Sequence, residues 1–271
     1  MLVALRNGQR VEAAFAARLS GYICPGCHQH VILKRGRQVC AHFAHKGATN
    51  CAGRRGETHE HLSLKALITE RLRQRGLQAH AEYALGSIPW ERRADVMVWS
   101  PSTNTPIAIE LQRSTLPIKE LEWRALSYCS LGIAQLWIPF LKPEYRDVME
   151  HRGSYIWQVS KYRPHQHELW ISGQNAHGIY WLVDPENQKF WQAKLSQHRL
   201  FTKEAIWYES GAIKRYQGPK SKISKRYRTL SLKGPYDFDD LKITIFDTRP
   251  KNSNYFQWPG GKIATFIVNG K

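Results

Sequence analysis

Acidic residues are scarce in this chain: 22 Asp and Glu stand against 40 Lys and Arg among 271 residues, a formal net charge of +18. Long apolar runs are missing too, so we expect neither a membrane span nor a secretory signal after Met1. The five cysteines are an odd number, which argues against a complete disulfide framework. We therefore expect a cytoplasmic protein with reduced thiols. Its positive charge favours a polyanionic partner such as DNA, the alternative being a basic protein without one.

The charge is unevenly distributed and divides the chain into three segments. Residues 1–55 hold nine Lys and Arg and one acid, residues 56–150 hold eleven and twelve, and residues 151–271 hold twenty and nine. We interpret these segments as a zinc-binding module, a nuclease-like domain, and a basic, Trp-rich C-terminal domain that is rich in β-structure. A nearly neutral centre between two basic flanks suits a site held between surfaces that grip a nucleic-acid backbone.

The first segment carries two paired motifs, Cys-Pro-Gly-Cys at Cys24 and Cys27 and His-Phe-Ala-His at His42 and His45, with fourteen residues between them. A Pro-Gly turn lets two thiolates face one ion, and two histidines complete a tetrahedral Cys2His2 set. We predict a structural Zn²⁺ site, because so short a segment lacks a core and no position for a metal-bound water is evident. Two alternatives stay open: Cys51 in place of a histidine, and a redox Cys-x-x-Cys with unrelated histidines.

The second segment opens with Glu57-Thr58-His59-Glu60-His61 and continues as a helical pattern to Arg75, with Gly76 as the stop. One stripe of this helix holds six residues at helical spacing: Glu57, His61, Leu64, Lys65, Ile68 and Leu72. Because the apolar end of the stripe should face the core, we expect its polar end to point inward as well. The alternatives are a solvated, capped helix start, and a shifted phase that exchanges Glu57 and His61 for His59 and Glu60.

Strand-like runs follow at 82–85, 93–99 and 107–113, then a helix at 117–129 and a buried strand at 133–140. The Pro- and Ser-containing residues 100–106 indicate a hairpin loop. The order helix, three strands, helix, strand is that of a restriction-endonuclease-like core. We therefore predict an α/β (α+β) fold: a mixed sheet flanked by helices, preceded by the small zinc module and followed by a β-rich C-terminal domain.

Two carboxylates lie inside these apolar strands, where they are costly to bury: Asp95 and Glu110. Their presence on neighbouring strands implies a positive group between them, most simply a divalent metal. Alternation with a period of two places Gln112 on the same face as Glu110. An Asp followed after a hairpin by Glu-x-Gln matches the PD-(D/E)xK nuclease arrangement in outline, with Gln112 in place of the usual Lys.

The third segment has tryptophans at intervals of ten to thirteen residues, which predicts successive short strands, although most of them also suit a core: Trp157, Trp170, Trp181 and Trp191. Residues 214–233 hold eight basic residues and no acid, interleaved with Tyr216 and Tyr227. Such a segment can follow a nucleic-acid backbone and stack bases. We predict seven DNA-binding residues here: Lys214, Arg215, Lys220, Lys222, Lys225, Arg226 and Arg228. The alternative is a disordered basic linker.

Over its N-terminal two-thirds the chain resembles the competence protein CoiA family. The resemblance rests on three sets of motifs in this order: Cys24 and Cys27 with His42-Phe43-Ala44-His45; Gly56-Glu57-Thr58-His59-Glu60-His61 with Lys65; and Arg93-Ala94-Asp95-Val96 with Glu110-Leu111-Gln112-Arg113-Ser114. It implies a restriction-endonuclease-like domain with Asp95 and Glu110 as candidate metal ligands. It also implies a role in natural transformation, in which incoming single-stranded DNA is handed to the RecA recombinase. Gln112 at the usual Lys position is common in this family.

These observations support the hypothesis of phosphodiester hydrolysis assisted by Mg²⁺ or Mn²⁺ on DNA, single-stranded or branched. Asp95 and Glu110 would bind the metal with the Leu111 carbonyl, and Glu57 or His61 would complete the set or hold a second ion. Gln112 would position a water, while Lys65 or Arg93 would screen charge. Two other interpretations stay open. One is a non-catalytic DNA-binding accessory of RecA-type recombination, and the other is a transposon- or phage-derived nuclease with no role in transformation.

Overall fold

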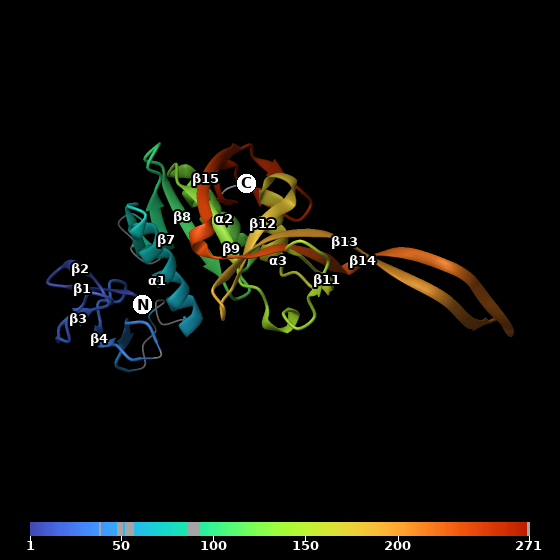
Figure 1. Ribbon diagram of the computed structural model, residues 1–271, viewed down its shortest axis with the longest axis horizontal. Helices are drawn as coiled ribbons and strands as arrows, with labels where there is room; N and C mark the ends of the chain where they lie inside the picture. The colour runs from blue at the N-terminus through green and yellow to red at the C-terminus, as the bar shows by residue number, and fades with distance from the viewer. Residues whose placement is uncertain (38, 48–50, 52–56, 86–92, 270–271) are drawn as a thin grey trace.

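The computed structural model describes residues 1–37, 39–47, 51, 57–85 and 93–269. Three parts follow one another in space: a small N-terminal sheet, a central body of sheets and helices, and a long two-stranded arm that projects from the body (Figure 1). No helix in the described residues combines the length and the apolar character needed to cross a bilayer. The expected boundary at residues 55 and 56 lies outside the described residues.

The N-terminal part is a five-stranded antiparallel sheet in the order β2-β1-β3-β4-β5. Its strands are β1 (Val3–Arg6), β2 (Gln9–Glu12), β3 (Tyr22–Ile23), β4 (His30–Lys34) and β5 (His42–His45). Its core is small and centred on Tyr22 and Phe43, whose ring centroids are 4.8 Å apart. So small a core needs a further restraint, which is consistent with a metal site in this module.

The central body is built on a six-stranded mixed sheet in the order β15-β18-β9-β8-β7-β6. Strand β9 is parallel to both β8 and β18, and the other neighbours are antiparallel. The strands are β6 (Ala79–Ala84), β7 (Arg93–Trp99), β8 (Pro106–Gln112), β9 (Ala134–Pro139), β15 (Leu241–Thr248) and β18 (Gly261–Val268). Strands β15 and β18 come from the C-terminal segment, so this sheet continues past residue 150, where we expected a domain boundary; that boundary stays a prediction.

Helices cover both faces of the sheet. Helix α1 (His59–Gln74) buries Leu64, Ile68 and Leu72 against the odd-numbered residues of β8, such as Ile109. On the other face, α2 (Ile118–Ser130) and α3 (Gln166–Gln174) pack in one cluster with Ala108. This alternation gives each face of β8 its own helix and places the helical stripe of α1 over the strands that carry the acidic residues.

A second sheet, in the order β10-β11-β14-β13-β12, lies beside the first and supports the arm. Its strands are β10 (Glu150–His151), β11 (Ile156–Tyr162), β12 (Ile179–Asp184), β13 (Lys189–Glu209) and β14 (Ala212–Tyr236). The smaller elements are η2 (Pro143–Tyr145), η3 (Ala176–Gly178), η4 (Phe238–Asp240) and the pair β16 (Lys251–Asn252) and β17 (Gln257–Trp258).

The arm consists of residues 199–223, where β13 and β14 pair only with each other among the described strands (Figure 1). Its two strands are joined at Ser210 and Gly211, which have φ angles of 53° and 79°. Positive φ at both central positions is the geometry of a tight hairpin turn, and a glycine adopts it at little cost.

The predicted fold class is confirmed: a mixed sheet flanked by helices follows a small Cys/His module and precedes a β-rich segment. The order helix, three strands, helix, strand is found as α1, β6, β7, β8, α2 and β9. The prediction for Trp170 is wrong, because this residue lies in α3 rather than in a strand, although it is fully buried. Residues 214–233 form part of strand β14 and are not a disordered linker.

Candidate functional site

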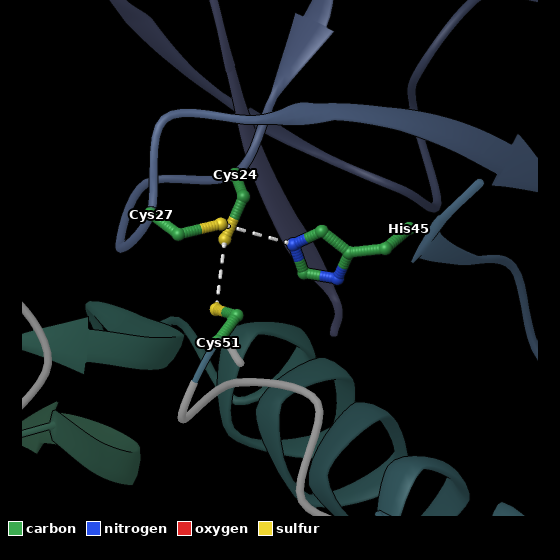
Figure 2. A group of neighbouring side chains, drawn as sticks. All are labelled: Cys24, Cys27, His45 and Cys51. Carbon is green, nitrogen blue, oxygen red and sulfur yellow. Dashed lines mark hydrogen bonds between the residues drawn. The ribbon is translucent and has the colours of Figure 1, made fainter. Parts of the chain in front are cut away.

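Four side chains of the N-terminal module converge on one point (Figure 2): Cys24, Cys27, His45 and Cys51. The possible ligand atoms all lie within 4.8 Å of one another. The Cys27 Sγ is 3.2 Å from Nε2 of His45, and the sulfurs of Cys24 and Cys51 are 3.7 Å apart. A tetrahedron with Zn–S bonds of about 2.3 Å has S···S edges of about 3.8 Å. This Cys3His set could therefore bind Zn²⁺.

The structure does not bring His42 into this group. Strand β5 runs from His42 to His45, and side chains three residues apart on a strand point to opposite faces. The Nδ1 of His42 is 3.0 Å from the carbonyl oxygen of Cys40 instead. Cys51 occupies the fourth position, the alternative that the sequence left open, so the Cys2His2 set is corrected to Cys3His.

A second group of possible ligands lies at the start of α1 and on β7. Glu57, His61 and Asp95 each place a ligand atom within 4.8 Å of the other two. The Nε2 of His61 is 3.1 Å from Oδ2 of Asp95. We call these three residues the acidic centre. The face of α1 that points inward therefore carries His61 and Lys65, as the predicted stripe has it. His59, from the shifted phase that was the alternative, is exposed.

Asp95 lies where strands β7 and β8 separate. Backbone pairing between them is present from Trp99 back to Val96, and at the next position the N–H of Leu111 donates to Oδ2 of Asp95 at 2.9 Å. Burial would raise the pKa of Asp95, but His61 and Lys65 outweigh it and hold this pKa well below its usual range. The carboxylate is therefore ionised and held in a fixed orientation.

Two buried cations hold the surrounding carboxylates. The Nζ of the fully buried Lys65 donates to Glu57 and, at 2.6 Å, to Glu82, and it is 3.9 Å from Asp95. Arg93 lies 3.4 Å from both Glu57 and Glu82. Burial alone would lower the pKa of Lys65, yet the neighbouring acids raise it, so this amine is charged. Lys65 thus contacts carboxylates rather than open space.

Glu110 and Gln112 share the other face of β8, as their spacing predicted. Glu110 accepts a hydrogen bond from Tyr128 and lies 3.4 Å from Arg124, both on α2. Burial and the negative charge of Asp95 outweigh the opposing effect of Arg124 and raise the pKa of Glu110 to about 7. Glu110 is thus near enough to Asp95 to sense its charge, although it is not a member of the acidic centre among the described residues.

Gln112 is the last residue of β8, and its side chain is hydrogen-bonded to the backbone that follows the strand. Its Nε2 donates to the carbonyl oxygen of Ser114 at 2.5 Å, which leaves the amide oxygen as an acceptor. Sequence reasoning missed three further members of this network: Glu82, Arg124 and Tyr128. Glu82 lies in a predicted strand, and its carboxylate in an apolar run was the available signal. The i, i+4 spacing of Arg124 and Tyr128 could have indicated a shared polar face on α2.

The basic residues predicted to bind DNA lie along β14. Lys214, Arg215 and Lys222 are exposed on the arm, and Lys225 and Arg226 are exposed at its base. Arg228 is half-buried, and its guanidinium donates to the carbonyl oxygens of Ser224 and Tyr227. The side chains of Lys220 and Tyr216 lie outside the described part.

Comparison with protein families finds two matches that follow one another along the chain. The competence protein CoiA nuclease-like domain matches residues 57–217, and the competence protein CoiA N-terminal domain matches residues 3–54. Comparison with curated proteins and with solved structures finds no significant match. The N-terminal domain match carries the Cys3His set, and the nuclease-like match carries the acidic centre, all of β13 and only the start of β14, residues 212–217. The chain therefore belongs to the competence protein CoiA family.

Proposed function

We propose that this protein is a DNA-processing nuclease that hydrolyses phosphodiester bonds with a divalent metal bound at the acidic centre. The observation that carries the proposal is the convergence of Glu57, His61 and Asp95, with Glu110 on the adjacent strand. Converging carboxylates on neighbouring elements of a nuclease-like domain are the expected ligands of Mg²⁺ or Mn²⁺.

The donor set fits such an ion. Glu57 Oε2 is buried, accepts no hydrogen bond from the described residues, and faces the amino group of Met1 at 3.4 Å. Asp95 and Glu110 would supply further oxygens, the Leu111 carbonyl a third, and His61 a nitrogen. When bound, the metal lowers the pKa of a coordinated water and offsets charge on the scissile phosphate.

The remaining residues of the site would hold the metal ligands in place or orient a water. Lys65 and Arg93 hold the carboxylates of Glu57 and Glu82 in place, so their role is to position the ligands. The amide oxygen of Gln112, for which the described residues provide no donor, would accept a hydrogen bond from the attacking water and so orient it. Tyr128 and Arg124 restrain Glu110 in the same way.

Zinc at the Cys3His set would serve folding. Three thiolates and one imidazole fill a tetrahedron, which leaves no position for a water and is typical of structural sites. The module packs through Leu2 and Val3 against Leu62 of α1 and Ala81 of β6. A folded module would therefore support the elements that carry the acidic centre.

DNA would be bound by the basic residues of β14, and competence implies that the DNA is single-stranded or branched and passes to a RecA-type recombinase. A second candidate function is a non-catalytic DNA-binding accessory of recombination. It is favoured by the cations Lys65 and Arg93, which already pair with Glu57 of the acidic centre and with the neighbouring Glu82.

The proposal is tested by incubating labelled single-stranded, duplex and branched DNA with the protein in Mg²⁺ or Mn²⁺. We expect cleavage that needs the metal and that falls at least about a hundredfold in Asp95→Asn, because the metal supplies several kcal/mol of charge stabilisation. The matched control is Asp247→Asn, which changes an exposed carboxylate on β15. Binding of every substrate without cleavage under either metal would favour the accessory function instead.

A further inference from the structure

A groove begins beside the acidic centre, where strands β8 and β9 end. Its first hollow, about 720 Å³, is lined by Glu60, Arg113, Thr115 and Phe140, among others. Glu60 precedes His61 on α1, and the ring of Phe140 lies edge-on to the His61 ring with 5.9 Å between centroids. One wall of this hollow therefore contacts a residue of the acidic centre.

The groove continues towards the base of the arm. A second hollow, about 580 Å³, shares four lining residues with the first: Thr115, Lys142, Glu144 and His165. At its far side it is lined by Arg163 and by Lys225, Arg226 and Arg228 of β14. We call the two joined hollows the basic groove. It links the acidic centre to the segment from which the arm projects.

The second hollow has an excess of positive charge over the acids that the structure describes around it. Lys142 lies 3.6 Å from Glu168, and Arg146 in the first hollow is paired with Asp184 at 3.1 Å and with Glu186. By contrast, Arg163, Lys225 and Arg226 form no ion pair with the acids of the described residues. Glu144 is the acid among the residues that line this hollow. A row of unneutralised cations in a concave surface attracts a polyanion.

Aromatic side chains accompany these cations. Tyr145 lines the second hollow, and Arg226 lies over the ring of Tyr227 at 5.4 Å from its centroid. Basic residues with adjacent aromatic rings are typical of surfaces that bind a single nucleic-acid strand, because unpaired bases stack on the rings while phosphates meet the cations. An acidic peptide would use the charges but would have no need of the rings.

We infer that the basic groove binds a single DNA strand, its phosphates on Arg163, Lys225 and Arg226, and leads this strand between the acidic centre and the base of the arm. This inference rests on the proposed function for the direction of the strand, but the binding itself does not depend on cleavage. It adds Arg163, His165 and Tyr145 to the residues expected to contact DNA.

The test is the affinity of a fluorescent oligothymidylate, measured by anisotropy at several salt concentrations without added divalent metal, so that cleavage plays no part. In the double variant Lys225→Glu/Arg226→Glu both altered side chains are exposed at the surface of β14. We expect its affinity to fall about tenfold or more, and the slope of log affinity against log salt to fall by about 1.4, or 0.7 for each lost contact.

The matched control is Lys242→Glu/Lys262→Glu, which makes the same change of net charge on β15 and β18 beside a separate hollow. Circular dichroism would establish that both variants are folded. Equal weakening by both variants would contradict the inference, because it would show that net charge alone sets the affinity. Full affinity in the groove variant would contradict it as well.

A second measurement locates the strand directly. Photo-crosslinking with an oligonucleotide that contains iododeoxyuridine, followed by mass spectrometry, should mark Tyr145 in the groove or Tyr227 next to Arg226 at its far side. Crosslinks confined to the arm or to the N-terminal module would overturn the path, even if the protein binds DNA and cleaves it. Conversely, groove crosslinks in a protein that never cleaves would leave the inference standing and remove the proposed nuclease activity.

Discussion

Lys65 is a residue whose role follows from its surroundings alone. Its amine is fully buried and is held between Glu57 and Glu82, close to Asp95. A buried cation of this kind balances the carboxylates around it, and its removal leaves them to the more distant Arg93 in a medium of low polarity. Lys65 therefore sets the stability of the acidic centre as well as its geometry.

We predict that Lys65→Met destabilises the fold by about 3–5 kcal/mol, because Glu57 and Glu82 lose the closer of the two cations that they share. Urea denaturation followed by circular dichroism measures this difference. The double variant Lys65→Met/Glu82→Gln should recover part of the loss, since it removes one of the stranded charges. A single variant within about 1 kcal/mol of the natural protein would show that the carboxylates do not need this partner.

Residues of the Cys/His motifs show how far single positions could be predicted. Cys24, Cys27 and His45 lie together, as the spacing of the two motifs predicted, and their role as zinc ligands stays a prediction. His42 was wrongly added because the sequence does not say that His-Phe-Ala-His is a strand, on which positions three apart face opposite ways. His-Phe-Ala-His is a strand because it pairs with β4, and such a contact between segments cannot be read from the motif itself.

The corrected ligand set gives a prediction on metal content. Purified protein should hold one zinc per chain, measured by elemental analysis, and Cys51→Ser should lose it, because a four-ligand structural site tolerates the loss of a thiolate poorly. His42→Ala is the matched control and should retain the metal. The reverse pattern, zinc lost with His42 and kept without Cys51, would restore the Cys2His2 set.

Among the elements, helix α1 joins the N-terminal module to the central sheet. The guanidinium of Arg73 on α1 binds both oxygens of Glu12 on β2 at 2.7 Å, and Arg10 binds the same carboxylate. Burial would raise the pKa of Glu12, but these two arginines outweigh it and lower this pKa below its ordinary value of 4.5. The ion pairs therefore fix the module against the helix that carries His61.

The pair Glu12–Arg73 predicts a stability difference that depends on pH. Because the pKa of Glu12 is lower in the folded state, its contribution is present above the ordinary pKa of 4.5 and is lost as the pH falls through the lowered value. Glu12→Gln should thus cost about 1 kcal/mol at pH 7 and almost nothing in strong acid. Glu70→Gln, an exposed carboxylate on α1, is the control. A difference that persisted unchanged in acid would contradict the ion-pair account.

Most elements of the central sheet could be predicted because local pattern and burial agree in them. Strand β7 was predicted with its observed bounds, and α1, β8, α2 and β9 to within a few residues. Trp170 was assigned to a strand from the spacing of the tryptophans alone. That spacing does not show whether the residues around each tryptophan follow a helical pattern. The addition of β15 and β18 to the sheet was not predicted, because parallel pairing of β18 with β9 joins residues more than a hundred positions apart.

The whole molecule has a body that carries the acidic centre and a basic arm that projects from it (Figure 1). Large apolar side chains are exposed along this arm, among them Phe201, Ile206 and Tyr208. A two-stranded ribbon is marginally stable by itself, and exposed apolar and basic groups on one are suited to contact with another molecule. Composition alone predicted a basic C-terminal segment, but its shape depends on the pairing of β13 with β14.

Shortening the arm should separate DNA affinity from folding. Phe201 and Ser221 are paired, so an Asn-Gly turn can join them in place of residues 202–220. We expect an unchanged melting temperature, because the sheet core around Trp191 and Leu230 is retained. The slope of log affinity against log salt concentration should fall by about 0.7 for each lost phosphate contact. Unchanged DNA affinity would show that the arm serves a different partner.

The most direct test of the central claim is whether the acidic centre binds a divalent metal. Zinc-loaded protein is titrated with Mn²⁺ in the absence of DNA. Electron paramagnetic resonance then measures the concentration of unbound Mn²⁺. We predict one saturable Mn²⁺ site whose affinity falls about tenfold or more in Asp95→Asn and stays unchanged in Asp247→Asn. A protein that binds no Mn²⁺, or binds it equally well in Asp95→Asn, would contradict the account.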